Sequence, residues 1–201
     1  YLGAHHCICF EDLSPEAIFQ RLEIFKPDVI VCKQHLKKKI ELALAINKEF
    51  DKPIVVLDAN KIKNFNSKKH KVGIYKKNYN LFTLFTSGST GKPKAITHGV
   101  GEYLKYAQFT TEYFFGVKRN TKIFTAVDAG WINGHTYALF GPLLCNSRTL
   151  IMEKPMMLLN KNSIINIINL GITILYLPVT IIRMLRSINI GKINSKSLIS
   201  L

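Results

Sequence analysis

The chain has 201 residues, of which 47% are hydrophobic, and it carries 28 Lys and Arg against 13 Asp and Glu, a formal net charge of +15. This apolar content is ample for a buried core, so one or two folded domains are possible. The charge suits anionic ligands, but Lys, Asn and Ile are abundant along the whole sequence, which argues against reading the charge as a specific nucleic-acid surface.

Residues 1–80 alternate between strand and helix signals, and we expect them to form a first α/β portion. Ser14 before Pro15 and Glu16 is typical of a helix start, because Ser caps, Pro fits the first turn and Glu suits the positive helix end. The short links predict a parallel α/β layer. The predicted strands are Ala4–Phe10, Asp28–Cys32 and Pro53–Leu57, and the predicted helices are Pro15–Phe25 and Lys37–Phe50.

Residues 81–201 are expected to form a second α/β portion. The apolar stretch Ile164–Leu185 raises the question of a membrane span, but Asn166, Asn169 and Pro178 interrupt it, so a buried helix, strand and helix fit better. The predicted strands are Leu81–Thr86, 95–98, Lys122–Ala126, Thr149–Met152 and Ile172–Leu177, and the predicted helices are Glu102–Phe115, Ser163–Asn169 and Val179–Ser187.

The four cysteines, Cys7, Cys9, Cys32 and Cys145, show neither a C-x-x-C pair nor the spacing of a zinc site. We therefore predict that they are small core residues of a protein in a reducing cytoplasm.

Between two predicted strands the chain reads T-S-G-S-T-G-K-P-K, residues 86–94. Gly88 and Gly91 allow amide groups to converge on one point, and hydroxyls and lysines add donors and positive charge. Such a loop suits a polyphosphate, with a flexible Ser/Gly turn as the alternative.

The loop is not a Walker A sequence, because only two residues separate its glycines and Pro93 follows Lys92 where Ser or Thr would stand. Pro93 also disfavours helical geometry at Lys92. We therefore predict that the loop leads into a strand, in contrast to a phosphate-binding loop that opens a helix.

A second segment of interest runs from Asp128 to Tyr137 and contains Trp131, the single tryptophan. Taken alone, an isolated Trp is best explained by core packing. We predict that Asp128 is a turn or network residue and not a base, and that His135 orients the turn through a hydrogen bond without acting in catalysis.

Residues 86–94 resemble the phosphate-binding signature of the AMP-forming acyl-CoA ligases, a superfamily that includes firefly luciferase and peptide-synthetase adenylation domains. The sequence G-A-H-H at 3–6 resembles the G-A-x-H segment of that family, and 128–137 resembles its D-x-G-W-x-x-G-H-S/T-Y segment. Residues 141–143 and 180–183 follow at the expected places. The D-x-G-W-x-x-G-H form points to the acetyl-CoA and propionyl-CoA synthetase branch.

The resemblance implies a partial layered α/β N-terminal domain of an adenylate-forming enzyme, divided into 1–80 and 81–201, with the C-terminal domain absent. It implies a cytoplasmic ligase that converts acetate, ATP and coenzyme A to acetyl-CoA, AMP and pyrophosphate. Mg²⁺ would be held through the ATP phosphates, with no metal ligands in the chain. Neither a membrane span nor a specific nucleic-acid partner is expected. The implied phosphate-binding residues are Thr86, Ser87, Gly88, Ser89, Thr90, Gly91, Lys92 and Lys94, and the implied acyl and coenzyme A pocket is Trp131, Ile132, Asn133 and His135.

Several positions depart from the family pattern. Ala95 replaces a usual Gly, Asn133 replaces the Thr usual in acetyl-CoA synthetases, and E-K-P-M-M at 153–157 replaces E-G-V-P-N, with an E-K-P order similar to that of the propionate branch. Propionate is therefore an alternative substrate. The adenine-binding segment and the C-terminal lysine of the family are missing, so the chain by itself is not expected to catalyse ligation. The third hypothesis is a truncated, non-catalytic protein that binds anions or RNA. The oligomeric state is left open.

Overall fold

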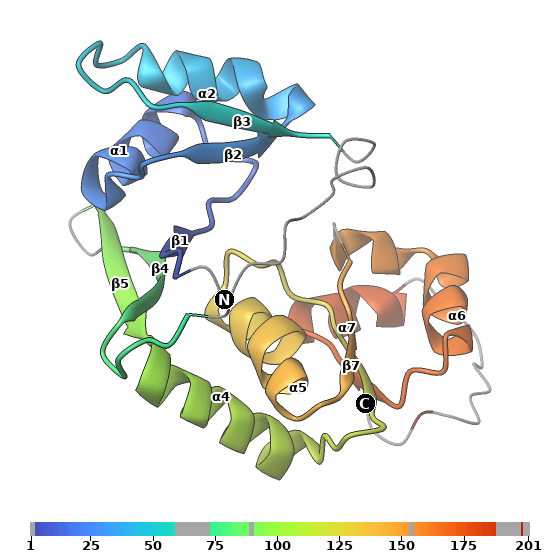
Figure 1. Ribbon diagram of the computed structural model, residues 1–201. Helices are drawn as coiled ribbons and strands as arrows, with labels where there is room; N and C mark the ends of the chain where they lie inside the picture. The colour runs from blue at the N-terminus through green and yellow to red at the C-terminus, as the bar shows by residue number, and fades with distance from the viewer. Residues whose placement is uncertain (1–2, 59–72, 89–90, 153–154, 188–197, 199–201) are drawn as a thin grey trace. The chain divides into compact units, whose positions relative to one another are not determined.

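A computed structural model describes residues 3–58, 73–88, 91–152, 155–187 and 198 (Figure 1). The chain divides into two compact units, Tyr1–Val100 and Gly101–Leu201. Both units mix helices and strands, which confirms the predicted α/β class. The predicted division at residue 80 stays a prediction.

The first unit contains a small parallel sheet covered by two helices. Strand β2 (Ile30–Lys33) pairs in parallel with β3 (Ile54–Leu57). Helix α1 (Pro15–Phe25), the short 3₁₀ helix η1 (Gln34–Leu36) and α2 (Lys37–Leu44) complete this region. Their apolar faces meet in one core of buried side chains, which consists of Ile18, Phe19, Leu22, Ile30, Cys32, Ile40 and Ala43.

Helix α2 ends at Leu44, six residues before the predicted end at Phe50. The side chain of Asn47 explains the early stop, because its Oδ1 accepts a hydrogen bond from the Glu49 amide at 3.0 Å, while the Phe50 amide donates to the Asn47 carbonyl at 3.0 Å. Such local bonds from Asn to the backbone compete with helix continuation.

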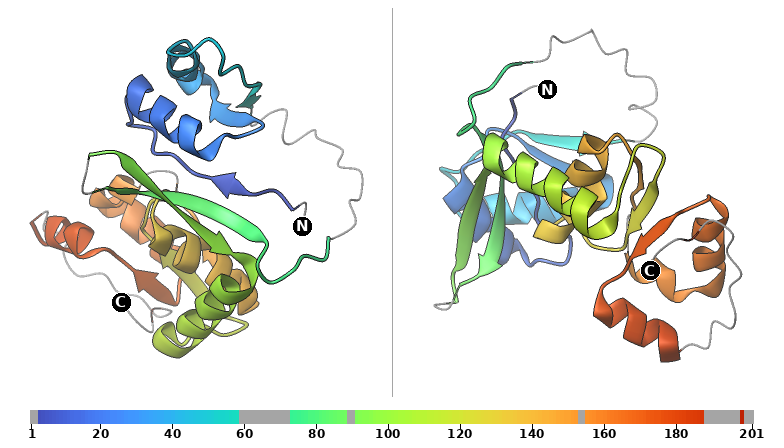
Figure 2. Two further views of the ribbon diagram at one scale, coloured as in Figure 1. Left: turned by 90° about the vertical axis from the view of Figure 1, so that its left-hand side faces the viewer. Right: turned by 90° about the horizontal axis from the view of Figure 1, so that it is seen from below.

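A second sheet of the first unit has the order β1-β4-β5. Strand β1 (His6–Cys7) runs parallel to β4 (Asn80–Ser87), and β4 runs antiparallel to β5 (Pro93–Gly99). Figure 2 shows β4 and β5 side by side as a twisted ribbon. The prediction of one parallel layer over residues 1–80 was therefore wrong for the first strand, which pairs with β4 and lies outside the sheet of β2 and β3.

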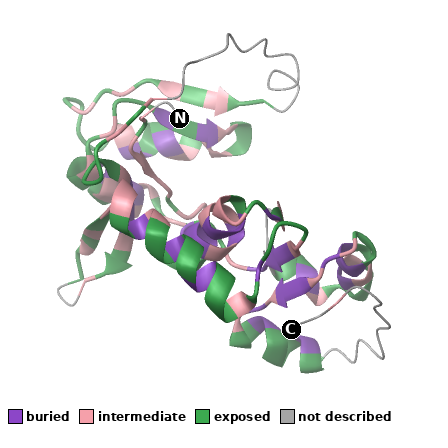
Figure 3. Cartoon of the chain, turned by 60° about the horizontal axis from the view of Figure 1, so that its bottom comes forward, coloured by how far each residue is buried: buried purple, intermediate pink, exposed green. Residues whose placement is uncertain are grey.

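The second unit is built on a parallel sheet of order β7-β6-β8, formed by Arg148–Leu150, Lys122–Thr125 and Ile174–Tyr176. Helix α4 (Val100–Phe115) buries one side and exposes the other (Figure 3). The remaining helical elements are the π-helix η2 (Gly134–Phe140), α5 (Gly141–Leu144), the 3₁₀ helix η3 (Pro155–Leu159), α6 (Lys161–Asn169) and α7 (Val179–Ser187).

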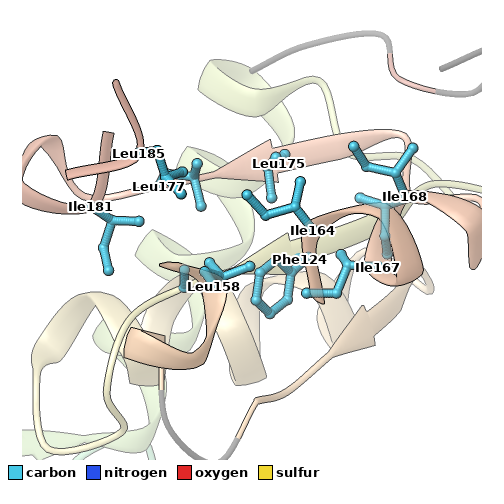
Figure 4. Close-up of a cluster of buried hydrophobic side chains, with 11 residues drawn as sticks. Phe124, Leu158, Ile164, Ile167, Ile168, Leu175, Leu177, Ile181 and Leu185 are labelled. Carbon is cyan, nitrogen blue, oxygen red and sulfur yellow. The ribbon is translucent and has the colours of Figure 1, made fainter. Parts of the chain in front are cut away.

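The core of the second unit gathers around Phe124 of β6, whose ring is fully buried (Figure 4). Side chains from α6, β8 and α7 pack around it, including Ile164, Leu175 and Ile181. The apolar stretch 164–185 is therefore a helix, a strand and a helix, as predicted, but α7 buries only Ile181 and Leu185 and exposes its other face. Among the described residues, no helix combines the length and the apolarity that a membrane crossing requires.

The prediction that all four cysteines are core residues was wrong. Cys32 is buried, but Cys7 and Cys145 are only partly buried and Cys9 is exposed. Cys9 follows the end of the short strand β1, where no further strand pairing covers it.

Candidate functional site

The polar loop at 86–94 joins two antiparallel strands. In the register of the hairpin, Ser87 faces Pro93 and Thr86 faces Lys94. The prediction that the loop leads into a strand is therefore confirmed. Ser89 and Thr90, two of the predicted phosphate-binding residues, lie outside the described residues.

The two glycines of the loop make its turn. The Gly91 amide donates to the Gly88 carbonyl at 3.1 Å. Gly91 has a φ of +79°, a left-handed conformation that side chains disfavour, although among the described residues beyond its chain neighbours no atom lies within 4 Å of the place where a Cβ would stand. Backbone conformation, more than space, thus requires glycine at this position.

The end of the hairpin presents donors to solvent. Thr86, Ser87, Gly91, Lys92 and Lys94 are all exposed. Thr86 and Lys94 face each other across the strands, and directly opposed residues have Cβ atoms about 4.5–5.5 Å apart. A hydroxyl and an ammonium group therefore share one face, an arrangement that suits the oxygens of a phosphate better than a cation.

Below the loop, a hydrogen-bonded network joins β4, β5 and the residue before β1. Thr83 Oγ1 lies 2.7 Å from Thr97 Oγ1 on β5 and 2.8 Å from His5 Nε2, which precedes β1. Thr83 is almost fully buried, and burial lowers the pKa of His5 below its usual 6.5. The network fixes the register below the loop. The sequence did not predict this network, because the pairing of Thr83 with Thr97 across the strands depends on the register of β4 and β5.

Helix α1 also contacts the loop end of β4. The Arg21 guanidinium carbon lies 5.5 Å from the centre of the Phe85 ring, and Nη1 of Arg21 donates to the Ala17 carbonyl at 2.7 Å. A cation over an aromatic face contributes about 0.5–1 kcal/mol at an exposed position. The contact connects α1 to the strand that leads into the loop.

In the second unit, Asp128 closes the turn that carries the tryptophan. Its Oδ1 accepts from the Gly130 amide at 2.7 Å, and its carbonyl accepts from the Trp131 amide at 3.1 Å. Asp128 is thus a turn residue, as predicted. A Cβ on Gly134 would overlap the carbonyl oxygen of Asp128, so close approach of two backbone segments requires glycine there.

The four predicted pocket residues of this segment divide into two groups. Trp131 is 62% exposed, and Ile132 and Asn133 are also exposed. The interpretation of Trp131 as a core residue was therefore wrong. The Asn133 amide nitrogen lies 3.5 Å from the Tyr176 hydroxyl oxygen, to which it donates.

His135, in contrast, is 1% exposed. Its Nδ1 lies 3.4 Å from the Trp131 carbonyl oxygen, and its ring stacks on Phe140 with centroids 6.3 Å apart. This position suits a residue that orients the turn. A role of Trp131, Ile132, Asn133 and His135 in an acyl and coenzyme A pocket stays a prediction.

One buried hydroxyl pair supports the same segment. The Thr136 hydroxyl donates to the Ile132 carbonyl at 2.9 Å and lies 2.8 Å from the Tyr103 hydroxyl of α4. Burial raises the pKa of Tyr103 to about 12, and its hydrogen bond with Thr136 acts in the opposite direction. Neither residue was singled out from the sequence.

The loop at 86–94 belongs to the first unit and the 128–137 segment to the second. Over the described residues, no group of three or more His, Cys, Asp and Glu side chains is placed to hold a metal ion.

Comparison with known proteins gives one consistent family. The family model for AMP-binding enzymes matches residues 1–200. The acetyl-coenzyme A synthetase of Helicobacter acinonychis is 33% identical over 180 residues, which cover 77% of this chain and 27% of that protein. Acetyl-coenzyme A synthetase 1 of Debaryomyces hansenii is 53% identical over 73 residues, which cover 36% of this chain and 11% of that protein.

Among solved structures, the acyl-CoA synthetase of Brucella canis has a TM-score of 0.77 with 21% identity, and the match covers 92% of this chain and 35% of that one. This likeness shows a shared fold. The chain thus spans about a quarter of the length of the curated relatives that match over most of it.

Proposed function

Because the chain belongs to the family of AMP-binding enzymes, we propose that its hairpin loop at 86–94 binds the β- and γ-phosphates of ATP in an enzyme that activates a short carboxylate, most simply acetate. The observation that carries the proposal is the exposed cluster of Thr86, Ser87, Lys92 and Lys94 around the turn of Gly88 and Gly91.

The proposed reaction has two steps. A carboxylate oxygen attacks the α-phosphorus of ATP and pyrophosphate leaves, which gives an acyl-adenylate. The sulfur of coenzyme A then attacks the acyl carbon and AMP leaves, which gives the thioester. The first step builds charge on the leaving pyrophosphate, so fixed donors at its oxygens lower the barrier.

The residues of the hairpin would supply those donors. The Lys92 and Lys94 ammonium groups neutralise charge, and the hydroxyls of Thr86 and Ser87, with the loop amides, orient the phosphates. Mg²⁺ bound to the ATP phosphates would neutralise further charge. The hydrogen bonds of Thr83 with His5 and Thr97 hold the strands below the loop, so the donors are positioned before ATP arrives.

The choice of acetate rests on the acetyl-coenzyme A synthetases that the chain resembles. We propose Ile132 as a wall of a small acyl pocket, Trp131 and Asn133 as its neighbours and His135 as the support of their turn. A small apolar pocket suits a short acyl chain. ATP and coenzyme A are cytoplasmic metabolites, so we propose that the enzyme works in the cytoplasm on small-molecule substrates.

The loop assignment is tested by Lys92→Ala and Gly88→Val in the complete gene product, assayed by acetate-dependent ATP–pyrophosphate exchange. A charge-assisted hydrogen bond contributes about 1.5–3 kcal/mol, so Lys92→Ala should lower exchange roughly 10–100-fold. Lys38→Ala changes another exposed lysine, on α2, and is the matched control. Exchange at the wild-type rate in both loop variants would refute the assignment.

The substrate is tested by comparing kcat/KM for acetate and propionate. One methylene in a fitted apolar pocket is worth about 1–3 kcal/mol, which corresponds to roughly 10–200-fold discrimination. A preference for propionate would reject acetate while leaving the phosphate assignment intact.

A further inference from the structure

Helix α4 presents a row of exposed aromatic side chains. Its inner face is fixed within the second unit, because the Tyr103 hydroxyl oxygen lies 2.8 Å from that of Thr136 and Ala107 is fully buried. Its outer face is exposed to solvent although it is rich in rings (Figure 3). Four ring side chains of α4 are between 59% and 72% exposed, namely Tyr106, Phe109, Tyr113 and Phe114.

Three of these side chains form one stripe. Tyr106, Phe109 and Tyr113 are three and four residues apart, the spacing that places side chains on one side of a helix. The rings of Phe109 and Tyr113 stack with centroids 5.4 Å apart, and the Phe114 ring meets that of Tyr113 edge-on at 5.3 Å. The rings are therefore contiguous, and a contiguous exposed apolar surface marks an interaction site more often than scattered apolar residues do.

Two exposed charges of opposite sign border this stripe. Lys105 directly precedes Tyr106, and Glu112 directly precedes Tyr113, so the charges lie two helical turns apart on the same flank. A second copy of α4 that runs in the opposite direction complements this pattern. Lys105 of each copy then meets Glu112 of the other, and in the same register Tyr106 of each copy lies against Phe109 of the other.

We propose that the stripe of α4 is a homodimer interface, in which two copies of the helix pack antiparallel about a two-fold axis near Gln108. The symmetry makes each contact occur twice, once from each copy. The charged flank favours the antiparallel direction, because a parallel pair would place Lys105 beside Lys105 and Glu112 beside Glu112. The interface requires neither ATP nor the hairpin loop, so it does not depend on the proposed ligase activity.

The exposed area of the rings determines how strong such a dimer is. A fully buried aromatic side chain removes about 150–250 Å² from water, so four rings that are about two-thirds exposed offer roughly 400–700 Å² per copy. A stable interface of standard size takes about 800 Å² from each partner. The net charge of +15 on each copy also opposes association. We therefore expect a weak dimer with a dissociation constant of roughly 1–100 μM.

The test is sedimentation velocity of the 201-residue chain at concentrations that bracket this range, in about 0.15 M salt to screen part of the repulsion. Phe109→Ser removes the central ring. Lys105→Glu and Glu112→Lys each place like charges opposite one another, and the double variant restores two attractive pairs. Lys38→Glu on α2 and Glu23→Lys on α1 are the matched controls, since they make the same changes in net charge at exposed sites.

A second measurement tests the register without any substitution. A carbodiimide joins an amine directly to a carboxylate that it touches. Lys105 and Glu112 of one helix are about 10.5 Å apart along its axis, too far to be joined within one copy. In a mixture of unlabelled and heavy-nitrogen-labelled chains, the cross-link between Lys105 and Glu112 should therefore also connect light peptides with heavy ones, as mass spectrometry can show.

We expect this mixed cross-link to form, and both control variants to dimerise within about 3-fold of the wild type. Phe109→Ser should raise the dissociation constant about 10–100-fold. Each single charge reversal should raise it about 5–50-fold, because both pairs become repulsive, and the double variant should return to within about 3-fold of the wild type. A chain that stays monomeric, a double variant no tighter than the single ones, or the absence of mixed cross-links would overturn the proposal.

Discussion

The substitution Gly134→Ala tests whether the turn at 128–134 is as tightly packed as the structure indicates. A Cβ at this position would overlap the Asp128 carbonyl oxygen and lie 2.9 Å from its carbonyl carbon and 3.0 Å from the Ala129 Cα. These are backbone atoms, and the turn they belong to is tied by the bonds of Asp128 to Gly130 and Trp131. No flexible side chain can move aside to make room.

Two effects of opposite sign decide the outcome. Gly134 lies in a helical segment, where alanine would stabilise by roughly 0.5–1 kcal/mol if there were space. Overpacking against a fixed neighbour costs about 1–3 kcal/mol. The clash should win, and the free energy of unfolding of the second unit should fall by about 1–2 kcal/mol. A unit of this size changes its Tm by about 4–8 °C per kcal/mol.

The assay is thermal unfolding followed by circular dichroism and by tryptophan emission. Trp131 is the single tryptophan of the chain and lies three residues from the substitution, so its emission should also shift in the folded state. Gly116→Ala is the matched control, since Gly116 has a φ of +62° and, within the described part of the chain, no atom beyond its chain neighbours lies within 4 Å of its absent Cβ. It should destabilise by about 1–2 kcal/mol through backbone strain alone, without a change in emission. A Gly134→Ala chain as stable as the wild type, with unchanged emission, would refute the packing argument.

Two further predictions concern the second unit. The raised pKa of Tyr103 means that the folded state favours the neutral phenol, so this group stabilises the fold fully below pH 10.0 and loses that contribution as pH rises to about 12, a change of roughly 2–3 kcal/mol at about 1.4 kcal/mol per pH unit. The urea midpoint of Tyr103→Phe should therefore fall less steeply with pH over that range than the urea midpoint of the wild type, and equal slopes would contradict the prediction. Phe124→Ala should lower the free energy of unfolding by about 3–5 kcal/mol in a urea titration, because the ring is fully buried. Ile182→Ala, at a side chain that is 47% exposed on α7, should change it by no more than about 0.5 kcal/mol, and similar losses in both variants would contradict the assigned core.

The features that the sequence predicted well are those with a local cause. Ser14 accepts a hydrogen bond from the Ala17 amide at 3.2 Å, as its position before Pro15 and Glu16 predicted. Pro93 follows the loop and begins β5, because proline disfavours helical geometry at the residue before it. In each case, a few neighbouring residues determine the backbone conformation, so one sequence is enough.

The features that the sequence did not predict depend on residues far apart in the chain. Strand β1 pairs with β4 across more than seventy positions, as in the pair of His6 and Phe82, and no local pattern distinguishes this partner from the nearer β2. The exposure of Trp131 has the same cause, since the side of the turn that is covered depends on α4 and on Tyr176 of β8.

The cysteines combine both kinds of information. The spacing of Cys7 and Cys9 can be read from the sequence, and it already places them on one side of an extended chain. Whether such thiols are covered depends on their surroundings, here the early end of β1, after which Cys9 is exposed. The expectation that free cysteines are buried was correct for Cys32, which packs against the two helices of its sheet. It was wrong for Cys7 and Cys9 at and beyond the end of β1, and for Cys145 at the end of α5. The exposure of Cys9 is therefore a consequence of where the pairing of β1 with β4 ends, which depends on a strand more than seventy residues away and is not visible in the cysteine spacing.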